Sequence, residues 1–301
     1  MGFRTIDIGQ AAELHIKCGQ LEITTGDGIF LVPVEDVDQI IAHGANIRLS
    51  TMDLSILSQN KVSVLTLDEK YLPTAIVLPF EGHFRQSKLM HAQVGISGEL
   101  RDGLWLQIIR QKIINQSRAL TILGKDGAES VSRYANSITS FNADYNEALS
   151  AKEYFSHYHD GLNRRADDPI NSRLNYGYAV VRGYIARTLV ATGFHPTFGL
   201  HHDSQLNSFN LADDLIEPFR AIVDLIANDI IGSNTILSKT ERREITRVLH
   251  NACIIDNTKV NVMSAINIMI ESLKRIILSE THEELKLPLI LPIENMEGIT
   301  E

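Results

Sequence analysis

The spacing of apolar residues changes near residue 80 of this chain. Before that point, alternating or continuous apolar runs lie at 13–18, 21–24, 29–33 and 62–66. Alternation places every second side chain on one face of a strand, so these runs predict β-strands. Turn-forming residues, such as those at 25–28, separate them. The first 80 residues are therefore expected to form a small antiparallel sheet domain, with one short helix over 52–59.

Beyond about residue 91, apolar residues recur every three to four positions, which is the spacing of one face of an α-helix. Helices are expected over 103–114, 128–159, 169–192, 210–231, 239–250 and 260–279. Pro169 stands in the first turn of the third helix and Gly193 follows its last turn, as start and stop signals do. The predicted fold class is α+β, with a small N-terminal β-sheet domain followed by a larger all-helical domain.

These patterns divide the chain into a β-rich domain (1–80), a linker (81–93), a helical domain (94–285) and an acidic tail (286–301). Six glutamates stand against one lysine, Lys286, between residues 280 and 301. Pro288 and Pro292 also lie there. High charge and proline disfavour packing, so the tail is expected to be mobile and dispensable for chemistry and for stability. Docking of the apolar run at 287–291 onto the core or a partner is the alternative.

Composition and charge say less about the kind of protein than the spacing of apolar residues does. The formal net charge is −9, but residues 85–125 contain seven basic residues against two acidic ones. Attraction to phosphate depends on the local patch, so the total neither establishes nor excludes DNA binding. No apolar run approaches the roughly 20 residues that span a bilayer, and the N-terminus lacks the features of a signal peptide. Cys18 and Cys253 form no motif, so we expect a cytoplasmic protein without a membrane partner.

Candidate chemistry concentrates between residues 147 and 220. Asp214 and Glu217 stand three apart, so on a helix their side chains leave the same face. His202 precedes them and Glu147 lies on an earlier helix. Oxygen ligands with one imidazole suit Mg²⁺ or Mn²⁺ better than a structural zinc. Solvated carboxylates and a structural histidine explain the same pattern, and spacing alone leaves both interpretations open.

A longer combination of motifs identifies a family. Its parts are Glu147 with Tyr154-Phe155, the segments 164–179 and 193–202, and Asp214-Leu-Ile-Glu217-Pro-Phe-Arg220. Together they resemble the near-universal, first-numbered family of CRISPR-associated (Cas) proteins, the spacer integrases, in the form found with type II systems. The resemblance covers the whole chain.

The resemblance implies a metal-dependent DNA endonuclease and integrase. Such an enzyme inserts short foreign DNA segments, called spacers, into a repeat array through attack of a DNA 3′-hydroxyl on a phosphodiester. The residues that match the family's catalytic metal ligands are Glu147, His202 and Glu217, and the ion would be Mg²⁺ or Mn²⁺. His201, Glu153 and His157 are less favoured alternatives. A non-catalytic DNA-binding scaffold and a hydrolase of small phosphoesters are the other functions considered.

The resemblance also implies partners. They are double-stranded DNA, a second copy of the chain paired through the 1–80 domain, the small second-numbered Cas protein, and other type II Cas proteins. Because an arginine fork matches two phosphate oxygens, four arginines are candidates for DNA contact. They are Arg164, Arg165, Arg182 and Arg220, and surface salt bridges with nearby carboxylates are the alternative role for each.

Overall fold

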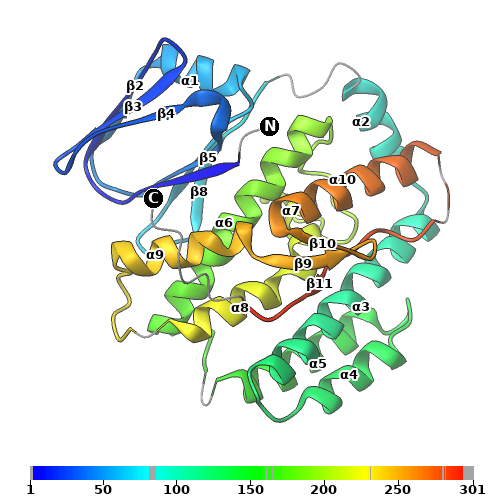
Figure 1. Ribbon diagram of the computed structural model, residues 1–301. Helices are drawn as coiled ribbons and strands as arrows, with labels where there is room; N and C mark the ends of the chain where they lie inside the picture. The colour runs from blue at the N-terminus through cyan, green and yellow to red at the C-terminus, as the bar shows by residue number, and fades with distance from the viewer. Residues whose placement is uncertain are drawn as a thin grey trace.

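The computed structural model describes residues 3–80, 86–159, 162–164, 166–230, 232–279, 281 and 283–293. Two four-stranded sheets form the N-terminal part, and most of the remaining described chain is helical (Figure 1). The predicted fold class, α+β with N-terminal sheets before a larger helical region, is confirmed. None of the described helices is long and apolar enough to cross a membrane.

The two sheets pack their apolar faces together. One consists, in spatial order, of β1 (Arg4–Ile8), β5 (Val37–Ala42), β7 (Ser63–Leu67) and β8 (Pro73–Val77). The other consists of β4 (Gly28–Pro33), β3 (Gln20–Thr25), β2 (Ala12–Lys17) and β6 (Ile47–Leu49). Leu14, Leu21 and Ile40 are buried in the core that the two sheets share.

The expected antiparallel arrangement is wrong for three strand pairs. β1 pairs with β5, β5 with β7 and β2 with β6 in parallel. Alternation determines the face on which a residue lies, and parallel and antiparallel strands share that alternation. Parallel neighbours need a crossover, and α1 (Thr51–Gln59) lies in the one between β5 and β7. Ser50 and Asp53 cap α1 with the reciprocal bonds of a capping box.

The helical region follows the predicted order, but two expected helices are interrupted, and the one expected over 239–250 becomes a 3₁₀ helix from Arg247 to His250. Its helices are α2 (Gln86–Gly95), α3 (Gly98–Ile122), α4 (Ala128–Ser137), α5 (Ala143–Tyr158), α6 (Pro169–Thr192), α7 (Asn210–Ile216), α8 (Arg220–Asp229), α9 (Lys239–Thr246) and α10 (Val262–Ser279). The helix expected over 128–159 is interrupted because Asn142 bonds to the backbone of Thr139 and Ser137. The helix expected over 210–231 is interrupted by a 3₁₀ turn at Glu217–Phe219, where Pro218 supplies no amide hydrogen.

Three short strands within the helical region were not predicted. They are β9 (Ala252–Ile255), β10 (Thr258–Asn261) and β11 (Leu289–Ile290), and β9 lies in the middle. Asp256 and Asn257 join β9 to β10 with φ of 51° and 58°. Two central residues at positive φ are typical of a tight hairpin turn, and Asp-Asn is the sequence signal for it. The predicted linker 81–93 contains most of α2, while residues 81–85 lie outside the described part.

Helix α6 joins the sheets to the helical region. Tyr184 and Arg187 both contact Asp38, which is fully buried at the end of the first sheet. Two turns earlier, the Tyr176 hydroxyl donates to Asp7 of β1 at 2.6 Å. Buried carboxylates are tolerated when they are paired and hydrogen-bonded. These two therefore fix the orientation of α6 on the sheet.

A third buried carboxylate, Asp224 of α8, ties three helices together. Tyr154 of α5 donates to its side chain at 2.8 Å, Tyr178 of α6 donates to the other oxygen, and Tyr158 donates to its backbone carbonyl. Burial raises the pKa of Asp224 to about 6, although the tyrosine hydroxyls and nearby arginines act against this. The cluster fixes α5 relative to α8.

The expectation that the C-terminal tail packs little is wrong for residues 286–293. Asn115, fully buried on α3, donates to the carbonyls of Pro288 and Pro218 at 2.9 and 2.7 Å. Arg118 donates to the carbonyl of Ile290 at 2.6 Å, and β11 pairs with β9. The acidic residues flank the apolar run at 287–291, and the structure shows that this run docks on the core, which is the alternative to a mobile tail. Residues 294–301 lie outside the described part.

Asn115→Ala is expected to lower the free energy of unfolding by about 1–3 kcal/mol, because it removes two buried hydrogen bonds to backbone carbonyls. Urea denaturation followed by circular dichroism measures this. Thr121→Ala is the control, since that exposed hydroxyl bonds within α3 alone. Equal stability of the two variants would show that the C-terminal segment contributes nothing to the fold.

Candidate metal and nucleic-acid site

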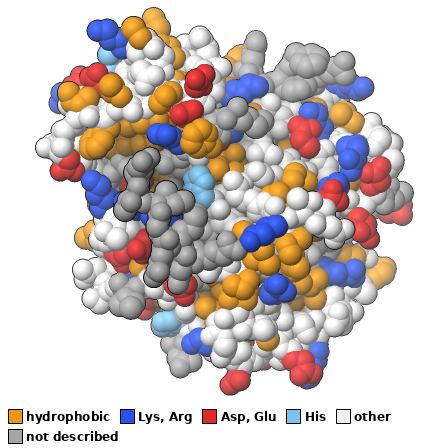
Figure 2. All heavy atoms as spheres, in the orientation of Figure 1, with side chains coloured by type: hydrophobic (Ala, Val, Ile, Leu, Met, Phe, Trp, Pro, Cys, Tyr) orange, Lys and Arg blue, Asp and Glu red, His pale blue; other side chains and the backbone are white. Residues whose placement is uncertain are grey.

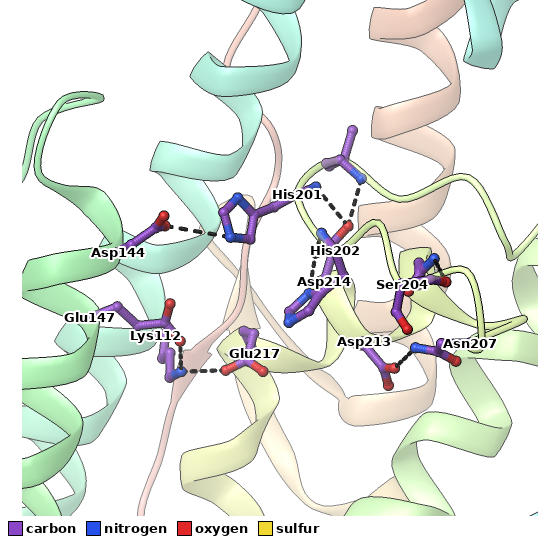
Figure 3. A network of polar contacts seen from close by, with 12 residues as sticks. Lys112, Asp144, Glu147, His201, His202, Ser204, Asn207, Asp213, Asp214 and Glu217 are labelled. Carbon is purple, nitrogen blue, oxygen red and sulfur yellow. Dashed lines mark hydrogen bonds and ion pairs between the residues drawn. The ribbon is translucent and has the colours of Figure 1, made fainter.

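Four elements contribute side chains to one polar network (Figure 3). Lys112 comes from α3, Glu147 from α5 and Glu217 from the 3₁₀ turn after α7. His202 comes from the link between α6 and α7. The three residues predicted as metal ligands are thus brought to one region, together with a lysine that was not predicted.

Glu217 is an almost completely buried carboxylate, with 5% of its side chain exposed. Its Oε1 atom accepts from Arg220 Nε at 2.8 Å, and its Oε2 atom lies 2.6 Å from Lys112 Nζ. Burial alone would raise the pKa of Glu217, but Arg220 and Lys112 lower it to about 2. Within the described part Oε2 accepts no hydrogen bond of good geometry, so the contact with Lys112 is an ion pair.

Lys112 lies between the two predicted acidic ligands. Its ammonium donates to Glu147 Oε1 at 2.5 Å while pairing with Glu217, and 8% of its side chain is exposed. Burial alone would lower the pKa of Lys112, but Glu217 and Glu147 raise it, so the lysine remains charged. A signal for this role was available in the sequence. Lys112 stands on the apolar stripe of its helix, four residues after Ile108 and three after Ile109, where a charge requires buried partners.

Asp214 shapes the loop that carries His202. Its carboxylate accepts the backbone N–H groups of residues 200–202 at 2.6, 3.1 and 3.1 Å. It also lies 2.7 Å from His202 Nδ1, and this hydrogen bond raises the pKa of the imidazole. Gly199 permits the turn, because a Cβ there would lie 2.3 Å from the carbonyl of His202 and 2.7 Å from Asp214. Asp214 and Glu217 are three apart as expected, but their carboxylates have different partners.

The less favoured candidates have other partners. The His201 ring stacks on Trp105 with centroids 4.3 Å apart, and its Nε2 lies 3.4 Å from Asp144. His157 and Glu153 pair with each other one turn apart on α5. This geometry favours His202 as the imidazole ligand, and the ligand assignment stays a prediction.

The predicted ligands have the chemistry of a Mg²⁺ or Mn²⁺ site. Glu147 and Glu217 already converge on one cation. His202 directs Nδ1 to the Asp214 carboxylate, and a histidine that binds a metal through its other nitrogen usually makes such a bond. In the described part, Nε2 of His202 makes no hydrogen bond. Nevertheless, no three His, Cys, Asp or Glu side chains of the described residues lie close enough together to bind an ion as they stand. Lys112 occupies the point where the two carboxylates meet.

Two of the predicted DNA contacts are engaged within the protein. Arg182 donates from Nη2 to Asp213 at 3.0 Å and also from Nε. Arg220, paired with Glu217, lies over the Tyr178 ring at 4.7 Å. The salt-bridge alternative therefore describes both side chains in this structure.

Arg164 differs from these two. Its guanidinium donates to Asn171 Oδ1 at 2.5 Å and to Asn175 Oδ1 at 3.3 Å, and both partners are neutral amides. The side chain also lines a cleft of about 980 Å³ together with Lys70 and Arg242. Arg165 lies outside the described residues.

Comparison with known proteins agrees with this geometry. Residues 8–258 match the family model "CRISPR associated protein Cas1". The CRISPR-associated endonuclease Cas1 of Neisseria meningitidis serogroup C is 32% identical over 302 residues, which cover 99% of both chains. A casposase bound to its integration product has the same fold, with a TM-score of 0.77, 19% identity and 100% and 96% of the two chains covered. A chain of a Cas6-RT-Cas1–Cas2 complex also has this fold, with a TM-score of 0.75 and 18% identity. The match covers 96% of this chain and 36% of that chain. The predicted family is confirmed: this chain belongs to the Cas1 family of CRISPR-associated proteins.

Proposed function

We propose that this protein is a metal-dependent DNA endonuclease and integrase that inserts spacers into a CRISPR repeat array. The observation that carries the proposal is the convergence of Glu147 and Glu217 on one buried cation beside His202. The full-length likeness to a Cas1 endonuclease and the fold shared with a casposase on its integration product support the same reaction.

The proposed reaction is attack of a DNA 3′-hydroxyl on a phosphodiester, which releases the 3′ oxygen of the attacked strand. A bound divalent ion would supply charge stabilisation at the phosphate and favour deprotonation of the attacking hydroxyl. Glu147, Glu217 and His202 Nε2 would bind that ion. Asp214 orients the imidazole through Nδ1, and Arg220 compensates the charge of Glu217.

Arg164 is the arginine best placed to bind a DNA phosphate. Its hydrogen bonds go to neutral amide oxygens, which leave the positive charge in place for an anion, although the buried carboxylate of Asp224 also attracts it. It lines the cleft described above, whose other charged residues are Lys70, Arg242 and four carboxylates, Asp68, Glu69, Asp167 and Asp168. Arg182 is neutralised by Asp213 and contributes less.

A second copy of the chain would pair through β4. This strand lies at the edge of its sheet and exposes Ile29, Phe30 and Leu31, which are 64, 49 and 61% accessible. Figure 2 shows hydrophobic side chains gathered over this sheet, at the upper left. A long apolar edge strand is prone to pair with another chain. The small second-numbered Cas protein is the further proposed partner, because a Cas1 chain of the same fold occurs in a complex with Cas2.

Strand transfer is expected to fall in each of three variants, Glu147→Gln, His202→Ala and Glu217→Gln. The loss should exceed the roughly 10–100-fold that follows from removing a residue that only orients a metal ligand. The measurement is insertion of a labelled short duplex into a repeat-containing plasmid with Mn²⁺, with a chelator as the blank. His201→Ala is the matched control, since its ring stacks on Trp105. Activity that survives in His202→Ala and disappears in His201→Ala would reverse the assignment of the imidazole.

Arg164→Ala is expected to flatten the dependence of log affinity on log salt by about 0.9, the value of one phosphate contact. Arg182→Ala should leave that slope unchanged, because its charge is already paired with Asp213. Fluorescence anisotropy with duplex DNA across a salt series measures both slopes. The opposite result, a flatter slope for Arg182→Ala alone, would place the DNA on the other face of α6.

Leu31→Lys is expected to raise the dimer dissociation constant at least about tenfold, because it places a charge on the apolar edge of β4. Sedimentation equilibrium measures the association. Ile236→Lys makes the same change at a side chain that is 79% exposed in the helical region and should leave association intact. Equal effects of both substitutions, or of neither, would exclude β4 as the dimer interface.

A further inference from the structure

Lys112 occupies the position at which the two acidic ligands of the proposed site meet. One nitrogen atom lies 2.5 Å from Glu147 Oε1 and 2.6 Å from Glu217 Oε2 (Figure 3). Oxygen ligands of Mg²⁺ lie about 2.0–2.1 Å from the ion, so an ion that binds both atoms must take nearly the same place. The ammonium and a divalent ion therefore exclude each other.

The charges at this point are balanced without any metal. Glu147 and Glu217 carry two negative charges, and Lys112 and Arg220 carry two positive ones. Arg220 contacts Oε1 of Glu217, on the other side of the carboxylate from Lys112. If Lys112 is still in place, an arriving divalent ion finds two carboxylates whose charges are already neutralised by Lys112 and Arg220. This arrangement weakens metal binding until the lysine moves.

The surroundings allow the lysine to move. Glu217 and Lys112 are 5 and 8% exposed, whereas 26% of the Glu147 side chain is exposed, so the Glu147 side is open to solvent. A lysine has a flexible four-carbon stem and a single compact charge, and it makes no rigid fork with a carboxylate. Arg220, by contrast, is fixed on Glu217 and on the Tyr178 ring.

We infer that Lys112 is an internal counter-ion that keeps the two carboxylates of the site together before metal binds and competes with the divalent ion for them. The inference rests on the proposed metal site. It makes Lys112 a positioning residue that lowers metal affinity while stabilising the metal-free protein. A purely structural lysine would have the opposite effect, because its loss would disorder the ligands and weaken metal binding.

The test is Mn²⁺ binding by the full-length protein without DNA, measured from the electron paramagnetic resonance signal of free Mn²⁺. Lys112→Met is expected to bind Mn²⁺ at least about tenfold more tightly than the wild type. Its melting temperature should fall in chelator and rise more on addition of Mn²⁺, because binding stabilises the folded state by RT ln(1 + [Mn²⁺]/Kd), which is larger for a smaller Kd. Lys125→Met removes the same charge from an exposed position beyond α3 and should leave both quantities unchanged.

Lys112→Gln covers the case in which the methionine variant fails to fold, because an amide still donates a hydrogen bond to a carboxylate without carrying a charge. Tighter Mn²⁺ binding by this variant supports the inference. Wild-type affinity in both Lys112 variants overturns it, and leaves the proposed function standing provided that Glu147→Gln abolishes the wild-type binding. No Mn²⁺ binding by the wild type or by either Lys112 variant overturns the inference and the proposed metal site together.

Discussion

The charge of Glu217 is the constraint on which the arrangement of this site depends. A carboxylate that is buried must be paired or it destabilises the fold, and Glu217 receives Arg220 from the following turn and Lys112 from α3. Helix α3 meets the site at three points on one face. Trp105 stacks on the loop that carries His202, Lys112 lies between the carboxylates, and Asn115 binds the carbonyl beside Glu217. Residues spaced by seven and three positions share a helix face, so one helix aligns the loop, the ligands and the C-terminal segment.

How much of the fold could be predicted depended on whether the signal was local. Helix α6 was predicted with its observed limits, because Pro169 and Gly193 specify both ends through backbone conformation alone. The direction of the strands was not predictable from alternation, since a parallel and an antiparallel neighbour require the same pattern. The break at Pro218 left a visible signal, and the motif around it was interpreted as one continuous helix. Its interruption turns Glu217 towards α3 and separates its role from that of Asp214.

For the candidate site, the sequence motifs predicted the residues that meet but not the contacts that they make. The motif spacing brought Glu147, Glu217 and His202 to one region, but it carried no information about the partners that each would have. Lys112 was counted among the basic residues of a surface patch, although its position on an apolar stripe indicates burial. The packing of the C-terminal segment was not predicted for a related reason. Its net charge describes the glutamates, whereas its packing is set by the apolar residues between them and by donors on Asn115 and Arg118.

The proposed binding of DNA must be compatible with a net charge of −9. Of the basic residues between 85 and 125, Lys112 is neutralised by two carboxylates, Glu147 and Glu217. Arg182 and Arg220 are paired with carboxylates as well. Fewer cations are therefore available to phosphate than the sequence count suggests. An ion bound between Glu147 and Glu217 would add two positive charges and release the ammonium of Lys112. The proposed site would then become positive at the moment when it is ready for chemistry, so that metal binding and phosphate attraction would be coupled through one buried lysine.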